Sequence, residues 1–276
     1  MLKLKLLTKE DLEVLNRNLL SAGITDYKKS FGGRDAWATD IMDLKQYAFP
    51  RSEGAYISTI VSASGYIEKM QPWENAVGIR PAIKYSEIER GSQYVGLDEN
   101  GITCVKYGEY PQTKLSDKEN TRLTLLFEMG LLTKTKHKYS MLNAHPVDFS
   151  TLLCFGSYLV DCLKPVIELQ EYRDETGSKY VKKDDSWYKV EPIIWQVDKK
   201  HDIALTKNVL TSGLLYGACP IEKFIKEYLS KEIVQPTVSK VKVTKINLKN
   251  VLEDMNLNKE KTAPEIGISE KVKVKR

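Results

Sequence analysis

Cysteine and histidine are the side chains that most often bind metals or act as nucleophiles, so their spacing is a first test for chemistry. The chain has four cysteines: Cys104, Cys154, Cys162 and Cys219. No two of them form a C-x-x-C pair, which argues against a zinc ribbon and against a disulfide scaffold. No two of the three histidines have the spacing that brings two rings together on a helix or strand. We therefore expect reduced, buried thiols, no required metal and no cofactor.

Sequence motifs for catalysis and nucleotide binding are also missing. The sequence contains no P-loop, dinucleotide-binding glycine motif, H-E-x-x-H zinc motif, nucleophile elbow or EF-hand loop. The adjacent carboxylates Asp184 and Asp185 follow two lysines and are more typical of a solvated turn than of a catalytic pair. Residues 31–34 and 62–65 are rich in glycine or serine and favour plain turns over anion-binding loops. The sequence thus predicts no catalytic residues and a protein that is not an enzyme.

The net charge of the chain is located at its C-terminal end. Residues 236–276 contain ten Lys or Arg and five Asp or Glu, whereas residues 1–235 contain 32 of each. A dedicated nucleic-acid reader usually carries a basic surface on its folded body. The distribution therefore argues against a folded nucleic-acid-binding domain, although a basic tail could still contact nucleic acid or an acidic protein.

This composition predicts an α+β body at residues 1–235 and a basic, extended C-terminal arm at residues 236–276. The arm alternates apolar and basic residues, a pattern that can add as a strand to an exposed sheet edge of a protein partner or of a second copy. The residues that we expect to contact a partner are Lys240, Val241, Lys242, Val243, Ile246, Leu248 and Leu252. The alternative is a mobile tail that only keeps the protein in solution.

Local patterns predict the elements of the body. Alternating leucines predict a strand at residues 2–6, and Thr8 with Asp11 resembles a capping box that starts a helix. A proper capping box at Ser116 and Glu119 starts a second helix. Further strands are expected at residues 55–63, 78–85 and 102–110, a short helix near 40–47, two hairpins at 166–181 and 187–209, and a helix from residue 220. We expect mixed or antiparallel sheets and one cooperative body.

Three segments resemble an uncharacterised family of bacterial and phage proteins with YPQ, PIxW and RPA motifs. They are V-G-I-R-P-A-I at residues 77–83, Y-G-E-Y-P-Q-T at 107–113, and V-E-P-I-I-W-Q-V at 190–197 with L-T-K-N-V-L at 205–210. The resemblance implies a fold similar to the C-type-lectin-like domains of formylglycine-generating enzymes. No catalytic cysteine or metal ligand of those enzymes has a matching motif, so no catalytic residue carries over.

The order of these segments departs from the family. The RPA segment precedes the YPQ segment here, and Asp198 and Thr206 replace an expected leucine and serine. Either the body is a circularly rearranged single domain, or a truncated first unit with a boundary near residues 90–100 precedes a second. The aromatic and basic residues of these segments are interpreted as core or sheet-face residues: Arg80, Tyr107, Tyr110 and Trp195.

No apolar run is long enough for a membrane helix, and lysines interrupt the apolar N-terminus where a signal peptide would be continuous. We expect a soluble protein of the cytoplasm, or of the virion or host cytoplasm if a phage encodes it. The leading hypothesis is a non-enzymatic binding or assembly protein of a phage or mobile element that engages a protein partner through its arm. The alternatives are a hydrolase-like enzyme with an unfamiliar site and a nucleic-acid-associated accessory or inhibitor protein.

Overall fold

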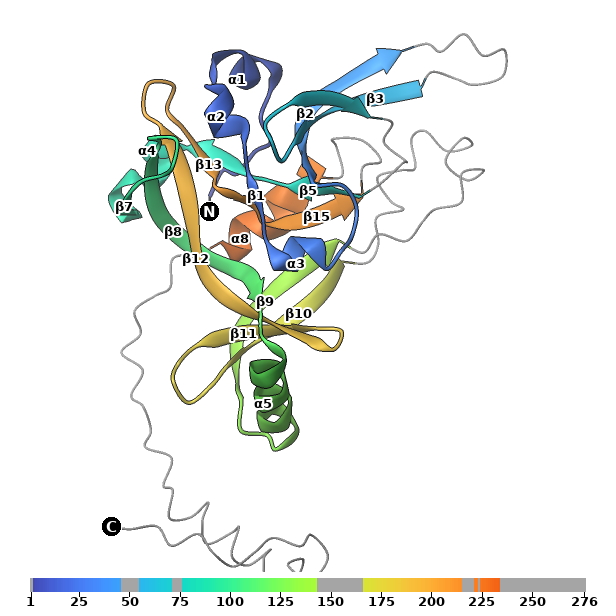
Figure 1. Cartoon of the computed structure of the whole chain (residues 1–276), viewed down its shortest axis with the longest axis vertical. Coiled ribbons are helices and arrows are strands. Elements are labelled where there is room, and N and C mark those ends of the chain that lie inside the picture. Colours follow the sequence, from blue (N-terminus) through green and yellow to red (C-terminus); the bar gives the residue numbers. More distant parts are fainter. Residues whose placement is uncertain are drawn as a thin grey trace, which may run out of the picture. The chain divides into compact units, whose positions relative to one another are not determined.

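The computed structural model of the chain describes residues 2–45, 55–70, 76–142, 166–214, 221–222 and 224–233. Two large β-sheets and several short helices form the body in Figure 1, which confirms the predicted α+β class with mixed and antiparallel sheets. The body's internal contacts end at Pro236. No helix in the described ranges is long and apolar enough to cross a membrane. The lectin-like, circularly rearranged topology stays a prediction, and the arm lies outside the described residues.

The predicted strand at residues 2–6 is extended but forms only one isolated bridge, an antiparallel pairing of Lys5 with Ala82. The two backbone hydrogen bonds of this bridge are both 2.9 Å long. Leu4 and Leu6 are buried while the lysines between and before them are not, so the period-two pattern identifies the correct buried face. The segment is therefore a single bridge rather than a strand.

The predicted helix after Thr8 is two short helices. The Thr8 hydroxyl accepts a hydrogen bond from the Asp11 amide and the Asp11 carboxylate accepts one from the Thr8 amide, which confirms the capping box. Helix α1 (Lys9–Val14) then ends, because the Asn16 side chain caps a second helix, α2 (Arg17–Leu20). A competing cap inside a helical pattern thus divides the element.

One sheet has five strands in the order β15-β5-β2-β3-β4. Its strands are β2 (Ala36–Lys45), β3 (Ala55–Ser62), β4 (Ile67–Met70), β5 (Ala76–Ile79) and β15 (Thr211–Leu214). The predicted strand at residues 55–63 is confirmed as β3, an interior strand of this sheet.

The short helix predicted near residues 40–47 is wrong, because that segment begins inside β2. β2 pairs antiparallel with β3, and its successive residues Trp37 and Ala38 are both fully buried. They belong to two different core clusters, one on each face of the sheet. This first part of β2 therefore lacks the polar alternation that marks a half-buried strand.

The second sheet has eight strands, and the long strand β12 is at its centre. The order is β6-β13-β12-β11-β10-β9, and β8 pairs with β12 and with β7. The strands are β6 (Ala82–Lys84), β7 (Gln93–Leu97), β8 (Thr103–Lys114), β9 (Thr133–Leu142), β10 (Val166–Arg173), β11 (Lys179–Lys183), β12 (Ser186–Asp198) and β13 (Ile203–Thr206). Both predicted hairpins are confirmed, as β10 with β11 and as β12 with β13. A short parallel pair, β1 (Gly23–Ile24) and β14 (Asn208–Val209), connects distant parts of the chain.

The strand predicted at residues 78–85 is two strands in two different sheets. β5 ends at Ile79 and β6 begins at Ala82, so Arg80 and Pro81 make the crossing. Proline cannot donate a ladder hydrogen bond, and Pro81 lies between the two strands rather than inside either of them.

Arg80 is a fully buried cation between the two sheets. Its Nε donates to the Thr206 carbonyl at 2.6 Å, Nη1 to the Leu20 carbonyl at 3.1 Å and Nη2 to Gln196 Oε1 at 2.7 Å. The guanidinium carbon lies 5.1 Å from the ring centroid of Trp37. Burial lowers the pKa of Arg80 to about 9, which leaves it protonated at neutral pH. The interpretation of Arg80 as a core residue is confirmed.

The aromatic residues of the recognised motifs also pack in the interior. Tyr110 and Trp195 are fully buried in the main core cluster, and Tyr107 packs against that cluster while partly exposed. Trp195 Nε1 donates to the Tyr107 carbonyl at 2.8 Å across the β8–β12 pair. These contacts confirm the core or sheet-face interpretation of the three residues.

The last described element is helical and packs on the core. The predicted apolar stripe is buried or partly buried: Ile221, Phe224, Ile225, Tyr228 and Leu229. The helix contains a π-helical turn, η2 (Ile225–Leu229), which continues into α8 (Ser230–Glu232). Its predicted first residue, Pro220, lies outside the described residues.

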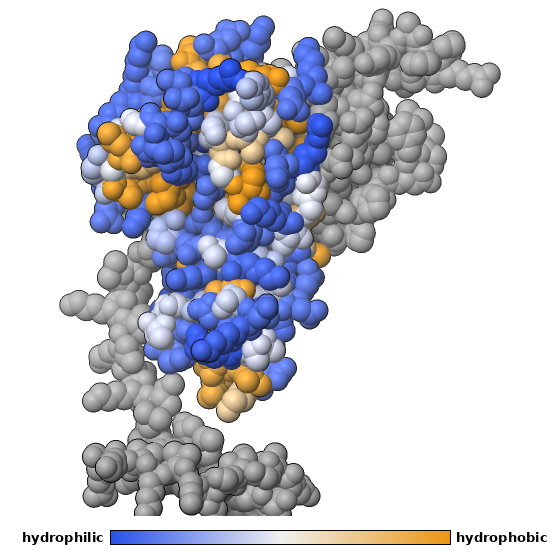
Figure 2. Space-filling model, viewed as in Figure 1, coloured by the Kyte–Doolittle hydropathy of each residue, from blue (hydrophilic) through white to orange (hydrophobic). Residues whose placement is uncertain are grey.

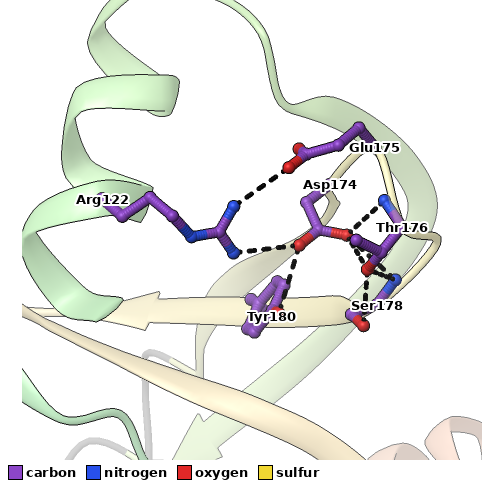
Figure 3. Close-up of polar contacts among 6 residues, drawn as sticks. All are labelled: Arg122, Asp174, Glu175, Thr176, Ser178 and Tyr180. Carbon is purple, nitrogen blue, oxygen red and sulfur yellow. Dashed lines mark hydrogen bonds and ion pairs between the residues drawn. The ribbon is translucent and has the colours of Figure 1, made fainter. Parts of the chain in front are cut away.

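Helix α5 (Asp117–Glu128) follows the predicted cap at Ser116 and is fixed to the β10–β11 turn by Asp174 (Figure 3). Asp174 Oδ1 accepts hydrogen bonds from the turn residues Thr176 and Ser178, and Oδ2 accepts from Tyr180 and from Arg122 of α5 at 3.2 Å. Burial alone would raise the pKa of Asp174, but hydrogen bonds from Thr176 and Arg122 hold it below its usual value. The carboxylate is a structural clamp.

We expect Asp174→Asn to lower the free energy of unfolding at neutral pH by about 2 kcal/mol, because an amide cannot accept from donors on both sides. The pKa of this carboxyl is depressed in the folded state, so its stabilisation is present above the unfolded value and is lost as the pH falls through the folded value. Urea unfolding of wild type and Asp174→Asn measures this. The difference between their free energies of unfolding should be smaller at pH 3 than at pH 7. The exposed carboxylate of the matched control Asp185→Asn should cost little at either pH, and an equal loss in both variants would contradict the clamp.

Candidate protein-binding edge

β7 is an edge strand that exposes apolar side chains. In the part of the chain that the structure describes, it pairs antiparallel with β8 and with no other strand. Tyr94 is 64%, Val95 47% and Leu97 63% exposed. Figure 2 shows hydrophobic residues gathered on the left side of the body, where Figure 1 places β7. An edge of this kind presents both unpaired backbone groups and apolar surface.

The contrast with β9, at the other end of the strand order, shows why β7 is unusual. β9 carries exposed lysines at every second position, namely Lys134, Lys136 and Lys138. Charged side chains on an edge strand disfavour pairing with another chain. β7 has no charged residue in its sequence, Q-Y-V-G-L. β9 is therefore protected against strand addition by charge, and β7 is not.

A β-bulge shapes the exposed strand. The register with β8 shifts between Tyr94 and Gly96, so Val95 is the extra residue of β7. Gly96 has a φ of 136°, which disfavours any residue with a side chain. A bulge bends a strand and redirects the side chains beside it. Here the bulge accompanies the exposure of apolar groups at successive positions.

The turn after β7 is connected to the buried Arg80. Asp98 Oδ1 accepts hydrogen bonds from the amides of Asn100 and Ile102, each at 2.9 Å, and Oδ2 accepts from Gln196 at 2.6 Å. Gln196 in turn accepts from Arg80. Burial alone would raise the pKa of Asp98, but these hydrogen bonds hold it below its usual value. The hydrogen bonds from Asp98 through Gln196 to Arg80 therefore attach this turn to the core.

The segment before β7 is fixed as well. It consists of α4 (Tyr85–Ile88) and the 3-10 turn η1 (Glu89–Gly91). Ile88 is fully buried, and both the amide and the hydroxyl of Ser86 donate to the Asp202 carboxylate at 2.8 Å. With both ends anchored, the exposed strand is a preformed surface, which lowers the ordering cost of binding.

The electrostatic surroundings of β7 are acidic. Residues 85–101 contain four acidic residues and one basic residue, a formal net charge of −3. The exposed carboxylates Glu87 and Glu89 precede the strand and Glu99 follows it, although Glu99 forms an ion pair with Lys207 at 2.9 Å. A basic segment laid along β7 would meet these groups at both ends.

A polar pocket of about 220 Å³ lies elsewhere on the body, lined by Ile24, Thr25, Asp26, Gln112, Thr113, Glu191 and Asn208. Its carboxylates already have partners: Asp26 accepts from the Lys114 amide at 3.2 Å, and Glu191 accepts from the Thr113 hydroxyl at 2.5 Å. Because its polar groups bind each other, the pocket is a weaker candidate than β7.

None of the sequence-predicted site residues is among the residues that the structure describes. The seven arm residues predicted to contact a partner lie outside the described residues: Lys240, Val241, Lys242, Val243, Ile246, Leu248 and Leu252. Cys104 is buried, as expected, and the other three cysteines are not among the described residues. Asp184 lies in a hairpin turn with a φ of 54°, which agrees with the turn interpretation. Within the described ranges, no group of three or more His, Cys, Asp or Glu side chains could hold a metal ion.

Sequence reasoning missed β7 itself. The signal was a short uncharged run with Tyr94, Val95 and Leu97, but the bulge disrupts the period-two alternation that identifies a strand. No protein-family model, curated protein or solved structure matches the chain. The candidate edge therefore rests on its geometry alone.

Proposed function

We propose that this chain is a non-enzymatic assembly protein, in which the C-terminal arm of one copy adds as a strand to β7 of a second copy. The observation that carries the proposal is β7: an uncharged edge strand with three exposed apolar side chains, paired on one side only within the described ranges. Strand addition supplies affinity through backbone hydrogen bonds and specificity through side chains at alternate positions.

The arm has the sequence that such an edge would accept. Residues 240–243 read K-V-K-V, so Val241 and Val243 can face the apolar side chains of β7 while the lysines beside them face solvent or carboxylates. The arm carries a formal charge of +5 and residues 85–101 one of −3. The two segments are therefore complementary in pattern and in charge.

Each copy carries both halves of the contact. The described chain ends at Ile233, which packs against Gly108 of β8, and β8 pairs with β7 through Lys106 and Gln93. An extended chain of the seven residues that follow Ile233 would span about 23 Å to residue 240. Two copies can exchange arms reciprocally, which closes as a two-fold dimer.

The test is sedimentation of the full chain over a range of concentrations. Wild type is expected to self-associate, and the double variant Tyr94→Lys and Leu97→Lys to associate at least about tenfold more weakly, because both lysines would be buried against the arm. The matched control is Leu125→Lys and Met129→Lys at the end of α5, where the replaced side chains are 54% and 63% exposed. The control should associate like wild type.

A mixing experiment then separates arm exchange from other contacts. A variant with Val241→Asp and Val243→Asp should be monomeric alone, as should the β7 double variant. Mixed together, they should form a heterodimer, since one intact arm and one intact edge remain. A monomeric wild type, association that the β7 substitutions leave unchanged, or a mixture that stays monomeric would each refute the proposal.

A further inference from the structure

Four buried polar atoms at the base of the last helix have no hydrogen-bond partner within the described structure: Tyr27 Oη, Tyr110 Oη, Thr211 Oγ1 and Glu232 Oε2. They come from helix α3 (Asp26–Lys29), β8, β15 and α8. Buried polar groups are nearly always paired, so each such atom needs an explanation.

These atoms belong to one cluster. The rings of Tyr27 and Tyr110 meet edge to face with centroids 5.8 Å apart. Burial raises the pKa of both phenols, and the charge of Glu232 raises each of them further, whereas the Thr211 hydroxyl acts in the opposite direction on Tyr110. The two phenols, the hydroxyl and the carboxyl therefore act on one another within one buried region.

Glu232 is the titratable member of the cluster and is only 7% exposed. Its Oε1 accepts a hydrogen bond from the Ser140 amide of β9 at 2.8 Å, which attaches α8 to the sheet. Burial raises the pKa of Glu232 to about 7, against the effect of the Ser140 hydrogen bond. As a neutral acid it carries no charge into this buried region, whereas a carboxylate here would be a buried charge without a counter-ion among the described residues.

We propose that Glu232 is a proton-operated latch: its neutral acid holds α8 on β9, and loss of that proton to solvent loosens α8. The latch stands on the burial and contacts of Glu232 alone. Its consequence for the arm rests on the proposed function, since release of α8 would let the arm that follows it extend farther towards a second copy.

The direction of the pH effect follows from the two states of the helix. The pKa of Glu232 is about 7 when α8 is docked and returns to its ordinary value of 4.5 when the released side chain is hydrated. Between these two pKa values, the ratio of released to docked helix rises about tenfold for each pH unit. Above pH 7 the ratio no longer rises. Docking is therefore tightest in mild acid and weakest above neutral pH.

Other titratable groups face Glu232 from the packed elements. Tyr27 and Tyr110 stay neutral across this range because burial raises the pKa of each. Glu168 of β10 raises the pKa of Glu232, in the same direction as burial. Burial lowers the pKa of His137 on β9. Protonation of this ring in acid therefore favours the released helix, which is the opposite of the effect of Glu232. A variant of Glu232 itself is needed to separate the two effects.

Hydrogen exchange of the amides at residues 224–233 in the full chain, corrected for intrinsic rates, measures the opening of this helix. Opening in wild type should increase by on the order of tenfold to a hundredfold between pH 5 and pH 8. Glu232→Gln should abolish the increase, because a neutral amide of the same shape does not titrate. Glu227→Gln, an exposed position on the same helix, should behave like wild type.

The same pH dependence in Glu232→Gln as in wild type would overturn the latch, whatever the sedimentation results show. A second measurement needs no variant: the carboxyl carbon of Glu232, followed by NMR in wild type, should titrate near pH 7. A midpoint near 4.5 would equally refute the proposal. Failure of arm exchange would appear instead as a monomeric wild type, so the two proposals fail separately.

Discussion

Arg80→Ala is expected to lower the free energy of unfolding by about 3–5 kcal/mol. The substitution leaves a cavity between the two sheets and removes the donors that now satisfy the Leu20 and Thr206 carbonyls and Gln196 Oε1. The substitution should also loosen the turn after β7, because Gln196 donates a hydrogen bond to Asp98 in that turn. Arg80 therefore links the stability of the core to the conformation of the candidate edge.

Two further substitutions at this position separate the causes of the loss. Arg80→Met refills most of the volume but provides no donor, so it should recover the part of the loss that is due to the cavity alone. Arg80→Lys keeps the charge but lacks the planar fork, and should leave at least one carbonyl unpaired. The exposed Arg90 gives the control Arg90→Ala, which should change little. Urea unfolding of the variants measures these losses, provided that the slope of the free energy against urea concentration is unchanged. A loss of unfolding free energy below about 1 kcal/mol for Arg80→Ala would contradict this role of Arg80.

The local chemistry of the sequence predicted the elements that depend on neighbours in the chain. The boxes at Thr8 and Ser116 and the two hairpins were found, because each needs only residues a few positions apart. The helix expected near residues 40–47 failed because residues 42–45 pair as part of β2 with β3, a non-local contact that the local pattern does not show.

The candidate sites could not be predicted in the same way. β7 is a binding candidate because its outer side has no partner in the described ranges, which is a property of the sheet and not of its five residues. The latch combines Tyr27, Tyr110, Thr211 and Glu232, which are at least 21 positions apart in the sequence and have no common spacing. Only the folded chain brings such residues together.

Gly108→Ala is expected to lower the free energy of unfolding by about 2–4 kcal/mol. Gly108 lies in the Y-G-E-Y-P-Q segment of β8, where the register with β12 shifts. Its φ of 71° is in the left-handed region, and a Cβ there would lie 2.5 Å from Cγ2 of the buried Ile233. The substitution therefore strains the backbone of β8, and its methyl group clashes with Ile233 at the end of α8.

A double-mutant cycle separates the two contributions. Ile233→Ala removes Cγ2 and therefore the clash. Adding Gly108→Ala in that background should lower the free energy of unfolding only by the cost of placing alanine at a positive φ, about 1–2 kcal/mol. Gly130→Ala is the matched control, since Gly130 has a φ of 68° and no described atom within 4 Å of the place that an alanine Cβ would occupy; it should cost about the same 1–2 kcal/mol. Equal losses for Gly108→Ala and Gly130→Ala in the wild-type background would show that the close packing of Ile233 against Gly108 does not contribute to stability.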